Sequence, residues 1–238
     1  MGTSVGIAAG LGAVAAGGTL AWAALSPGSQ MFGRTLVAPK RPDEIALTFD
    51  DGPNPAVTPQ LLEALARLGV RATFFLIGGF VRECPGLVRE IAAAGHVVGN
   101  HTMTHPWLAW QPERRIREEL GEATAAIEDV LGERVRYFRA PHGARRPAVL
   151  RMVREMGMVP VQWNAMGHDW RPISAAEIAT DVQKDVERNR LAGVGSNILL
   201  HDGGHLGLGA ARMESVKAME MLVGRNGTSR FVGVDTWV

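Results

Sequence analysis

The chain has little of several features that would assign a protein to a structural or functional class from composition alone. Its single cysteine, Cys84, excludes an internal disulfide framework and a cysteine-rich zinc site. The formal net charge is only +1 and aromatic residues make up 6%, with no basic stripe, so nucleic acid is not an expected partner. The composition, 46% hydrophobic and 21% charged, is typical of a folded domain. Nothing in the sequence implies an obligate protein partner.

Charge is also missing from the N-terminus, where the first charged side chain is Arg34. Residues 1–25 are apolar, and the Ala- and Gly-rich stretch of residues 5–25 approaches the ~20 residues that span a bilayer. Three interpretations compete: a signal peptide cleaved after Ala21-Trp22-Ala23, a membrane anchor, or a buried helix or tail of a soluble protein. We favour export or anchoring, and therefore the cell envelope; fractionation of a tagged chain distinguishes the three.

From residue 43 onward, short apolar runs alternate with helical patterns. This predicts one α/β domain over residues 43–238, after a linker at residues 26–42 that contains Pro and Gly. Such alternation indicates a mainly parallel sheet covered by helices, and the lack of a Gly-rich phosphate loop favours barrel-like closure. The expected strands are Glu44–Phe49, Ala72–Ile77, Val97–Gly99, Val135–Phe138, Met158–Trp163, Asn197–Leu200 and Arg230–Val234. The expected helices lie near 58–69, 85–95, 112–131, 147–156, 174–191 and 208–224.

Polar residues of the kinds that bind metals or move protons follow five of these strands. In β/α barrels, the carboxyl ends of the strands form the rim at which active sites are assembled. We therefore expect one active site at that rim. The five groups are Asp50-Asp51-Gly52-Pro53, His101 with His105, Arg139 to Gly143, Asp169-Trp170 and His201-Asp202.

Two of these groups together suggest a metal site. Adjacent carboxylates at Asp50 and Asp51 repel each other unless a cation lies beside them, and a metal lets one ligate while the other acts as a base. His101 and His105 can converge on the same ion from a helix or a tight turn. Two imidazoles and one carboxylate leave a position open for water, and without thiolates we expect zinc or another divalent ion that accepts N and O ligands. Each motif alone also fits solvated surface groups.

The last two groups suggest proton transfer and sugar contact. His201 ends an apolar strand and can titrate near neutrality, so it is a candidate general acid. Asp169 on a neighbouring strand can hold the imidazolium and set its pKa. Trp170 can form a wall on which a sugar stacks. The alternatives are that His201 is a core or supporting histidine and that Trp170 is a core tryptophan.

Together these motifs resemble the polysaccharide deacetylases, the NodB-homology family that is also called carbohydrate esterase family 4. The resemblance covers residues 43–235 in the family's order. It rests on Thr48-Phe49-Asp50-Asp51-Gly52-Pro53-Asn54, Arg71-Ala72-Thr73-Phe74-Phe75, His101-x-x-x-His105, Arg139-Ala140-Pro141-His142-Gly143, Asp169-Trp170 and Leu199-x-His201-Asp202.

The resemblance implies a distorted (β/α)7 barrel, preceded here by the N-terminal apolar segment. Carried over by position, Asp50 would be the catalytic base and His201 the general acid, with Asp169 tuning the acid and Arg139 orienting the base. The metal ligands would be Asp51, His101 and His105. The substrate contacts would be His142 (through its backbone N–H), Trp170 and Leu199.

The implied activity is removal of N-acetyl groups from N-acetylglucosamine-containing glycans, such as peptidoglycan or chitin-type oligosaccharides. Zinc is the expected ion, with cobalt, nickel or manganese as alternatives. An O-acetyl-xylan esterase or a lipid-linked sugar deformylase would use the same site, and an inactive glycan-binding module is the alternative from another class. Three positions depart from the family pattern and put the shape of the groove in question: Met166 for a usual Asp, His142 for a usual aromatic and Asn197 for an apolar residue.

Overall fold

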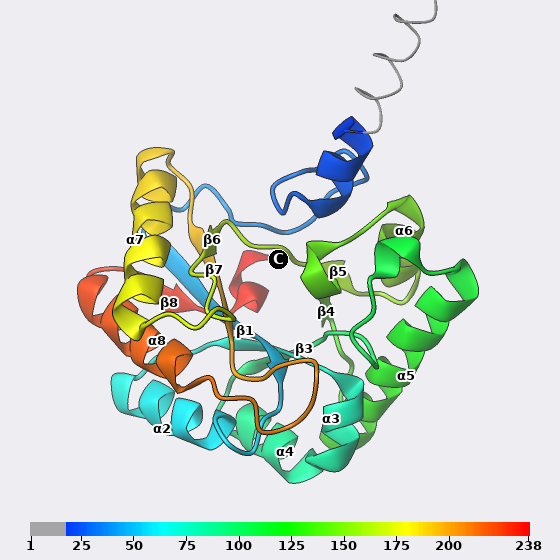
Figure 1. Cartoon of the computed structure of the whole chain (residues 1–238), viewed down its shortest axis with the longest axis horizontal. Helices are drawn as coiled ribbons and strands as arrows, with labels where there is room; N and C mark the ends of the chain where they lie inside the picture. The colour runs from blue at the N-terminus through cyan, green and yellow to red at the C-terminus, as the bar shows by residue number, and fades with distance from the viewer. Residues whose placement is uncertain (1–17) are drawn as a thin grey trace, which may run out of the picture.

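The computed structural model describes residues 18–238, and in that range the strands form one parallel sheet that curls within a ring of helices (Figure 1). The strands are β1 (Glu44–Gly52), β2 (Thr73–Leu76), β3 (Val97–Asn100), β4 (Tyr137–Phe138), β5 (Val159–Pro160), β6 (Ala165–Met166), β7 (Ser196–His201) and β8 (Arg230–Val232). The helices are α2 (Thr58–Leu68), α3 (Gly78–Glu83), α4 (Pro85–Ala93), α5 (Glu113–Leu131), α6 (Pro147–Glu155), α7 (Ala175–Leu191) and α8 (Met213–Arg225).

The sheet follows the path β5-β4-β3-β2-β1-β7-β6, and β8 pairs with β1 beside this path. Strands β5 and β6 are neighbours in sequence but lie at opposite ends of the path. The predicted α/β barrel-like architecture is confirmed, as an open barrel whose two edges face each other. Leu36 lies at the β5 edge, where it forms a parallel bridge with Val161.

β1 is the central strand, and all nine of its residues are buried. Its alternate side chains divide between two cores, as expected for a parallel strand covered on both faces. Ile45, Leu47 and Phe49 join the large core against the helices, whereas Ala46 packs inside the barrel with Phe75. Period two continues the interior face through Thr48 to Asp50, and the register with β7 places Asp50 directly opposite His201.

The end of β1 contains an irregularity that the sequence did not predict. The strand runs on through Asp50, Asp51 and Gly52, and its register with β2 shifts between Asp50 and Gly52. Asp51 is the extra residue of this bulge, with a left-handed φ of 70° that is uncommon for a non-glycine residue. A bulge re-aims a side chain, so two adjacent carboxylates can face one site instead of opposite faces of the sheet.

Several element boundaries differ from the sequence prediction. The expected strand Met158–Trp163 is shorter in the structure, where it covers Val159–Pro160, and a further strand, β6, follows it. Helix α3 was not predicted. The helix expected near 208–224 begins only at Met213, after a loop with glycines at 203, 204, 207 and 209.

The N-terminal part of the chain is described only from residue 18. Residues 18–25 are helical, and in the described part of the chain no helix combines the length and the apolar character that crossing a membrane requires. Most of the predicted signal or anchor segment, residues 1–17, lies outside the described residues, so that interpretation stays a prediction. Within the expected linker, residues 26–42, Leu36 N–H donates to Pro160 O and Leu36 O accepts from Gln162 N–H, each at 2.8 Å.

The close approach of the β1 and β7 exits can be tested at Gly203. A Cβ there would lie 2.0 Å from the carbonyl oxygen of Asp51, so Gly203→Ala forces the backbone apart. We expect it to lower the free energy of unfolding by about 1–3 kcal/mol in urea titrations. The control is Gly224→Ala in α8, where a Cβ meets nothing within 4 Å and should be neutral or stabilising. Equal stabilities of the two variants would contradict this packing.

Candidate active site

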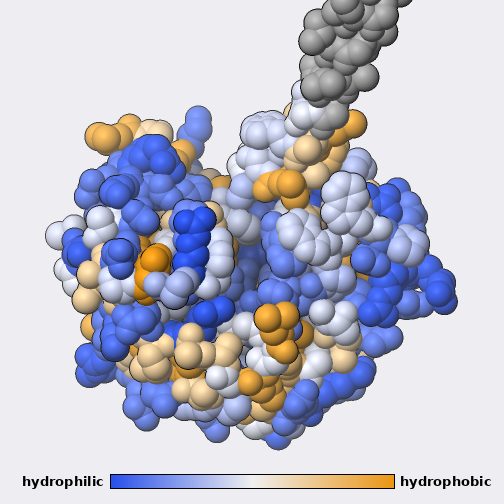
Figure 2. Space-filling view, in the orientation of Figure 1, coloured by the Kyte–Doolittle hydropathy of each residue, from blue (hydrophilic) through white to orange (hydrophobic). Residues whose placement is uncertain are grey.

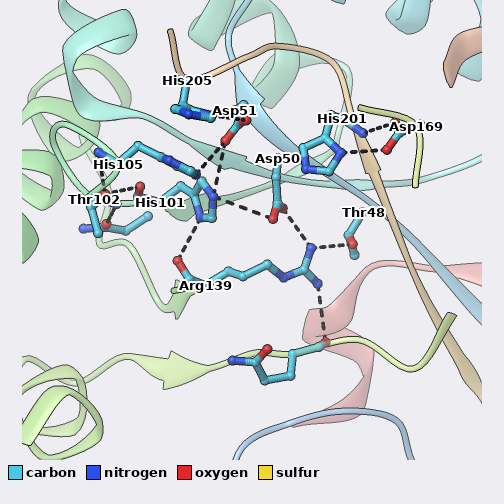
Figure 3. Close-up of polar contacts among 12 residues, drawn as sticks. Thr48, Asp50, Asp51, His101, Thr102, His105, Arg139, Asp169, His201 and His205 are labelled. Atoms are coloured by element: carbon cyan, nitrogen blue, oxygen red, sulfur yellow. Dashed lines mark hydrogen bonds and ion pairs between the residues drawn. The ribbon is translucent and has the colours of Figure 1, made fainter. Parts of the chain in front are cut away.

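Seven of the ten predicted site residues can be followed in Figure 3, where they converge at the carboxyl ends of the strands: Asp50, Asp51, His101, His105, Arg139, Asp169 and His201. Figure 2 shows a hollow in the same face of the molecule. The cavity has a volume of about 450 Å³. Its lining includes eight of the ten predicted site residues: Asp50, Asp51, His101, His105, His142, Trp170, Leu199 and His201. The other two, Arg139 and Asp169, are buried behind this lining and contact Asp50 and His201 respectively.

Three buried side chains could hold a metal ion. One ligand atom from each of Asp51, His101 and His105 lies within 4.8 Å of the other two. Asp51 Oδ1 is 3.4 Å from His101 Nε2 and 3.1 Å from His105 Nε2. His101 Nδ1 lies 2.8 Å from the carbonyl oxygen of Arg139, which holds the ring proton on Nδ1 and turns the Nε2 lone pair toward the carboxylate.

The donor set fits a divalent cation. Asp51 Oδ1 is buried and accepts no hydrogen bond from the described residues. A lone pair of His101 Nε2 facing that oxygen is unfavourable unless a positive charge lies between them. Two nitrogens and one oxygen, without thiolate, suit zinc or a similar ion.

The turn from His101 to His105 brings both rings to one side without forming a helix. Thr102 and His105 have positive φ values of 69° and 60°. Glu119, buried on α5, accepts the backbone N–H groups of Met103 at 2.9 Å and Thr104 at 2.8 Å, and so secures the turn. Of the helix and the tight turn that the sequence allowed for His101 and His105, the structure contains the tight turn.

The protonation states in this cluster suit metal binding. Burial raises the pKa of Asp51, but the imidazoles of His101, His105 and His205 outweigh it and bring the pKa well below its usual range. Burial lowers the pKa of His105 despite the opposing effect of Asp51. Burial and the neighbouring histidines lower the pKa of His142 to about 4. Neutral imidazole and ionised carboxylate are the forms that ligate metals.

Asp50 is paired with a fully buried arginine. Arg139 Nη1 donates to Asp50 Oδ1 at 2.8 Å and to Thr48 Oγ1 at 2.6 Å. Arg139 Nη2 donates to Asn197 Oδ1 at 3.2 Å. Asn197, one of the departures from the family pattern, therefore helps to hold this guanidinium. The contact leaves Asp50 Oδ2 facing His101 Nε2 at 3.7 Å.

His201 is held by Asp169. Asp169 Oδ1 lies 2.8 Å from His201 Nδ1, while Oδ2 accepts the backbone N–H of His201 at 2.7 Å and the hydroxyl of Ser215 at 2.6 Å. Burial alone would lower the pKa of His201, but Asp169, Asp51 and Asp50 outweigh it and raise the pKa to about 9. The imidazole therefore carries a proton at neutral pH.

The remaining predicted residues shape the cavity. Trp170 is half-exposed and meets His201 edge to face, with ring centroids 5.6 Å apart. His142 stacks on Trp107 at 4.0 Å between centroids. His205 stacks on His105, with ring centroids 4.5 Å apart.

Three supporting residues were missed from the sequence: Thr48, Glu119 and Ser215. Thr48 stands in the quoted motif, and its period-two spacing to Asp50 on one strand could have shown that both face the interior. Glu119 and Ser215 lie in amphipathic helices, far in sequence from the groups that they contact. Nothing local distinguishes them from other polar helix residues.

Comparison with known proteins agrees with this geometry. A family model described as polysaccharide deacetylase matches residues 38–161. The chitooligosaccharide deacetylase of Azorhizobium caulinodans is 39% identical over 160 residues, which are 67% of this chain and 73% of that protein. A peptidoglycan-N-acetylglucosamine deacetylase of Bacillus cereus is 37% identical over 165 residues, 68% of this chain and 58% of that protein. A crystal structure of a peptidoglycan N-acetylglucosamine deacetylase superposes with a TM-score of 0.75 at 32% identity, covering 85% of this chain and 91% of the other.

The cation site can be tested without a substrate. Asp51→Ala removes the carboxylate ligand, so we expect zinc affinity to fall by about 100-fold or more in calorimetric titrations. His168→Gln is the matched control, because His168 lies outside the cluster of possible ligands and should leave zinc affinity unchanged. Equal zinc binding by the Asp51→Ala variant and the wild type would rule out this ligand set.

Proposed function

The chain belongs to the polysaccharide deacetylase family, and from this premise we propose that it hydrolyses N-acetyl groups on N-acetylglucosamine-containing glycans. Peptidoglycan and chitin-type oligosaccharides are the candidate substrates, since relatives are named for both. One observation supports the proposal above all: an arginine-paired carboxylate, three side chains that could hold a cation and a histidine whose pKa is raised to about 9 line or adjoin a single cavity. A module that only binds glycans has no need of this combination.

Asp51, His101 and His105 would hold the ion, for which zinc is the first candidate and cobalt, nickel or manganese are alternatives. When bound, a divalent ion supplies Lewis-acid polarisation of the acetyl carbonyl and lowers the pKa of a water molecule. The tight turn and the Arg139 carbonyl fix the two imidazoles in advance, so little reorganisation accompanies ion binding.

Asp50 acts as the general base. Its Oδ1 is occupied by Arg139 Nη1, so Oδ2 is the oxygen free to accept a proton from the attacking water. Arg139 is buried and fixed by Thr48 and Asn197, which holds the carboxylate in one orientation. The backbone N–H of His142 donates to the oxyanion that develops on the acetyl group, and one such donor is typically worth ~3 kcal/mol.

His201 acts as the general acid. An amine cannot leave an amide as an anion, so the nitrogen must receive a proton as the bond breaks. His201 carries this proton because Asp169 holds its other ring nitrogen and keeps its pKa near 9. Leu199 and Trp170 bound the space for the acetyl group and the sugar.

Two other acyl substrates would use the same groups: an O-acetylated xylan and an N-formylated, lipid-linked sugar. Product analysis separates them, since N-deacetylation releases acetate and leaves a free amine. Acetate with a free hydroxyl would indicate the esterase, and formate would indicate the deformylase.

The base assignment is tested by Asp50→Asn. This variant keeps the ligand triad but cannot accept a proton, so we expect zinc content near that of the wild type and acetate release lower by about 10²–10⁴-fold. The substrate is an N-acetylglucosamine oligomer, with acetate measured enzymatically. Asp129→Asn, on the exposed face of α5, is the control and should retain full activity. Undiminished turnover by Asp50→Asn would refute the assignment.

The acid assignment predicts a pH dependence. A general acid with a raised pKa works while protonated, so kcat/KM should fall as pH rises through about 9. Asp169→Asn removes the negative charge that holds the proton, so the alkaline limb should move to lower pH. Ser215→Ala keeps that charge and should move it far less. An unchanged alkaline limb in Asp169→Asn would show that another group is the acid.

A further inference from the structure

A segment before the domain core reaches the cavity of the proposed active site. We call residues 24–29 the strap; its first two residues are the last two of the helical stretch 18–25. Leu25 and Pro27 of the strap line the same cavity as Asp50, His201 and Trp170. In Figure 2, apolar side chains of the N-terminal segment lie close to the rim of the hollow.

The strap is fastened by Arg145, which is 1% exposed. Its Nη2 donates to the carbonyl oxygens of Ser26 at 2.7 Å and Ser29 at 2.8 Å. Its backbone N–H donates to Ala24 O at 3.1 Å, and its Nη1 donates to Gly143 O at 3.0 Å. One guanidinium therefore joins the strap to the turn that carries His142.

These carbonyls compensate a buried charge. Within residues 18–238, Arg145 forms no ion pair with a carboxylate, and burial lowers its pKa. A buried cation without a counter-charge needs oriented dipoles, and the carbonyl end of a helix is the negative end of its dipole. The carbonyls of residues 24, 26 and 29, at and just beyond the end of the helix, supply them. Loss of the strap would leave this charge uncompensated.

The chain is fastened again just beyond the strap. Gln30 and Thr35 close a turn through two side-chain hydrogen bonds, at 2.7 and 2.9 Å. Leu36 then joins the β5 edge, and the carbonyl of Val37 accepts from Asn197 Nδ2 at 3.1 Å. The strap is thus held at both ends in a fixed position beside the cavity.

We propose that the strap is a wall of the glycan-binding cleft, and that Leu25 and Pro27 contact the sugar unit adjacent to the one that loses its acetyl group. This inference rests on the proposed function and extends it to substrate length. Leu25 is 41% exposed and Trp170 is 45% exposed on the same cavity. Such exposed apolar surfaces suit the C–H faces of pyranose rings. Arg145 is a positioning residue that acts through the strap.

The test compares Leu25→Ser with Leu20→Ser in the full chain. Both leucines are exposed on the same helical stretch, but Leu20 does not line the cavity. We expect Leu25→Ser to raise KM for N-acetylglucosamine oligomers about tenfold while kcat stays within about twofold, because an apolar binding contact is lost and the chemistry is not. Leu20→Ser should match the wild type. Indistinguishable KM values for Leu25→Ser and Leu20→Ser would overturn the proposal.

A second variant tests the clamp. Arg145→Met keeps an unbranched aliphatic side chain but removes the guanidinium that holds the carbonyls of Ser26 and Ser29. It should raise KM without loss of zinc content, and adding Leu25→Ser should then raise KM little further, because the strap is already displaced. If the effects of Arg145→Met and Leu25→Ser on KM are fully additive, Arg145 does not act through the strap. If the wild-type chain is active and Leu25→Ser leaves KM unchanged, the proposed role of the strap is wrong and the proposed function stands. If the zinc-loaded wild-type chain releases no acetate, the proposed function is wrong and this inference with it.

Discussion

Two adjacent carboxylates buried at the end of the central strand are the constraint on which the rest of the site depends. Asp50 and Asp51 are 3% and 4% exposed, and burying both charges without positive partners would be prohibitive. Arg139 compensates Asp50, and the triad of Asp51, His101 and His105 is suited to a cation. The bulge in β1 makes the arrangement possible, because a regular strand would point the two side chains to opposite faces.

Arg139 couples the two halves of the site. Its guanidinium orients Asp50, while its backbone carbonyl fixes the tautomer of His101. The parallel sheet explains how this is achieved with residues far apart in sequence, because every strand of the path delivers its carboxyl end to the same rim. The acid pair of His201 and Asp169 arrives on that rim from the other side of β1, through the register of β7.

The sequence predicted the candidate site residues that lie in short contiguous motifs. Asp50-Asp51, His101 with His105, and His201 all follow apolar strand patterns, so their convergence could be predicted together with the α/β barrel-like class. The bulge at Asp51 could not, because a left-handed non-glycine residue leaves no compositional mark. Glu119 and Ser215 contact partners 16 and 46 residues away in sequence, and Arg145 secures carbonyl groups, which every residue carries. Such contacts become visible only once the helices and the strap are in place.

The central claim is that Asp51, His101 and His105 bind one ion. It is tested most directly by zinc K-edge X-ray absorption of the full chain loaded with one equivalent of zinc. The account predicts a spectrum with the outer-shell scattering of two imidazoles and otherwise oxygen ligands. A spectrum without imidazole scattering, or with a sulfur ligand from Cys84, would contradict it.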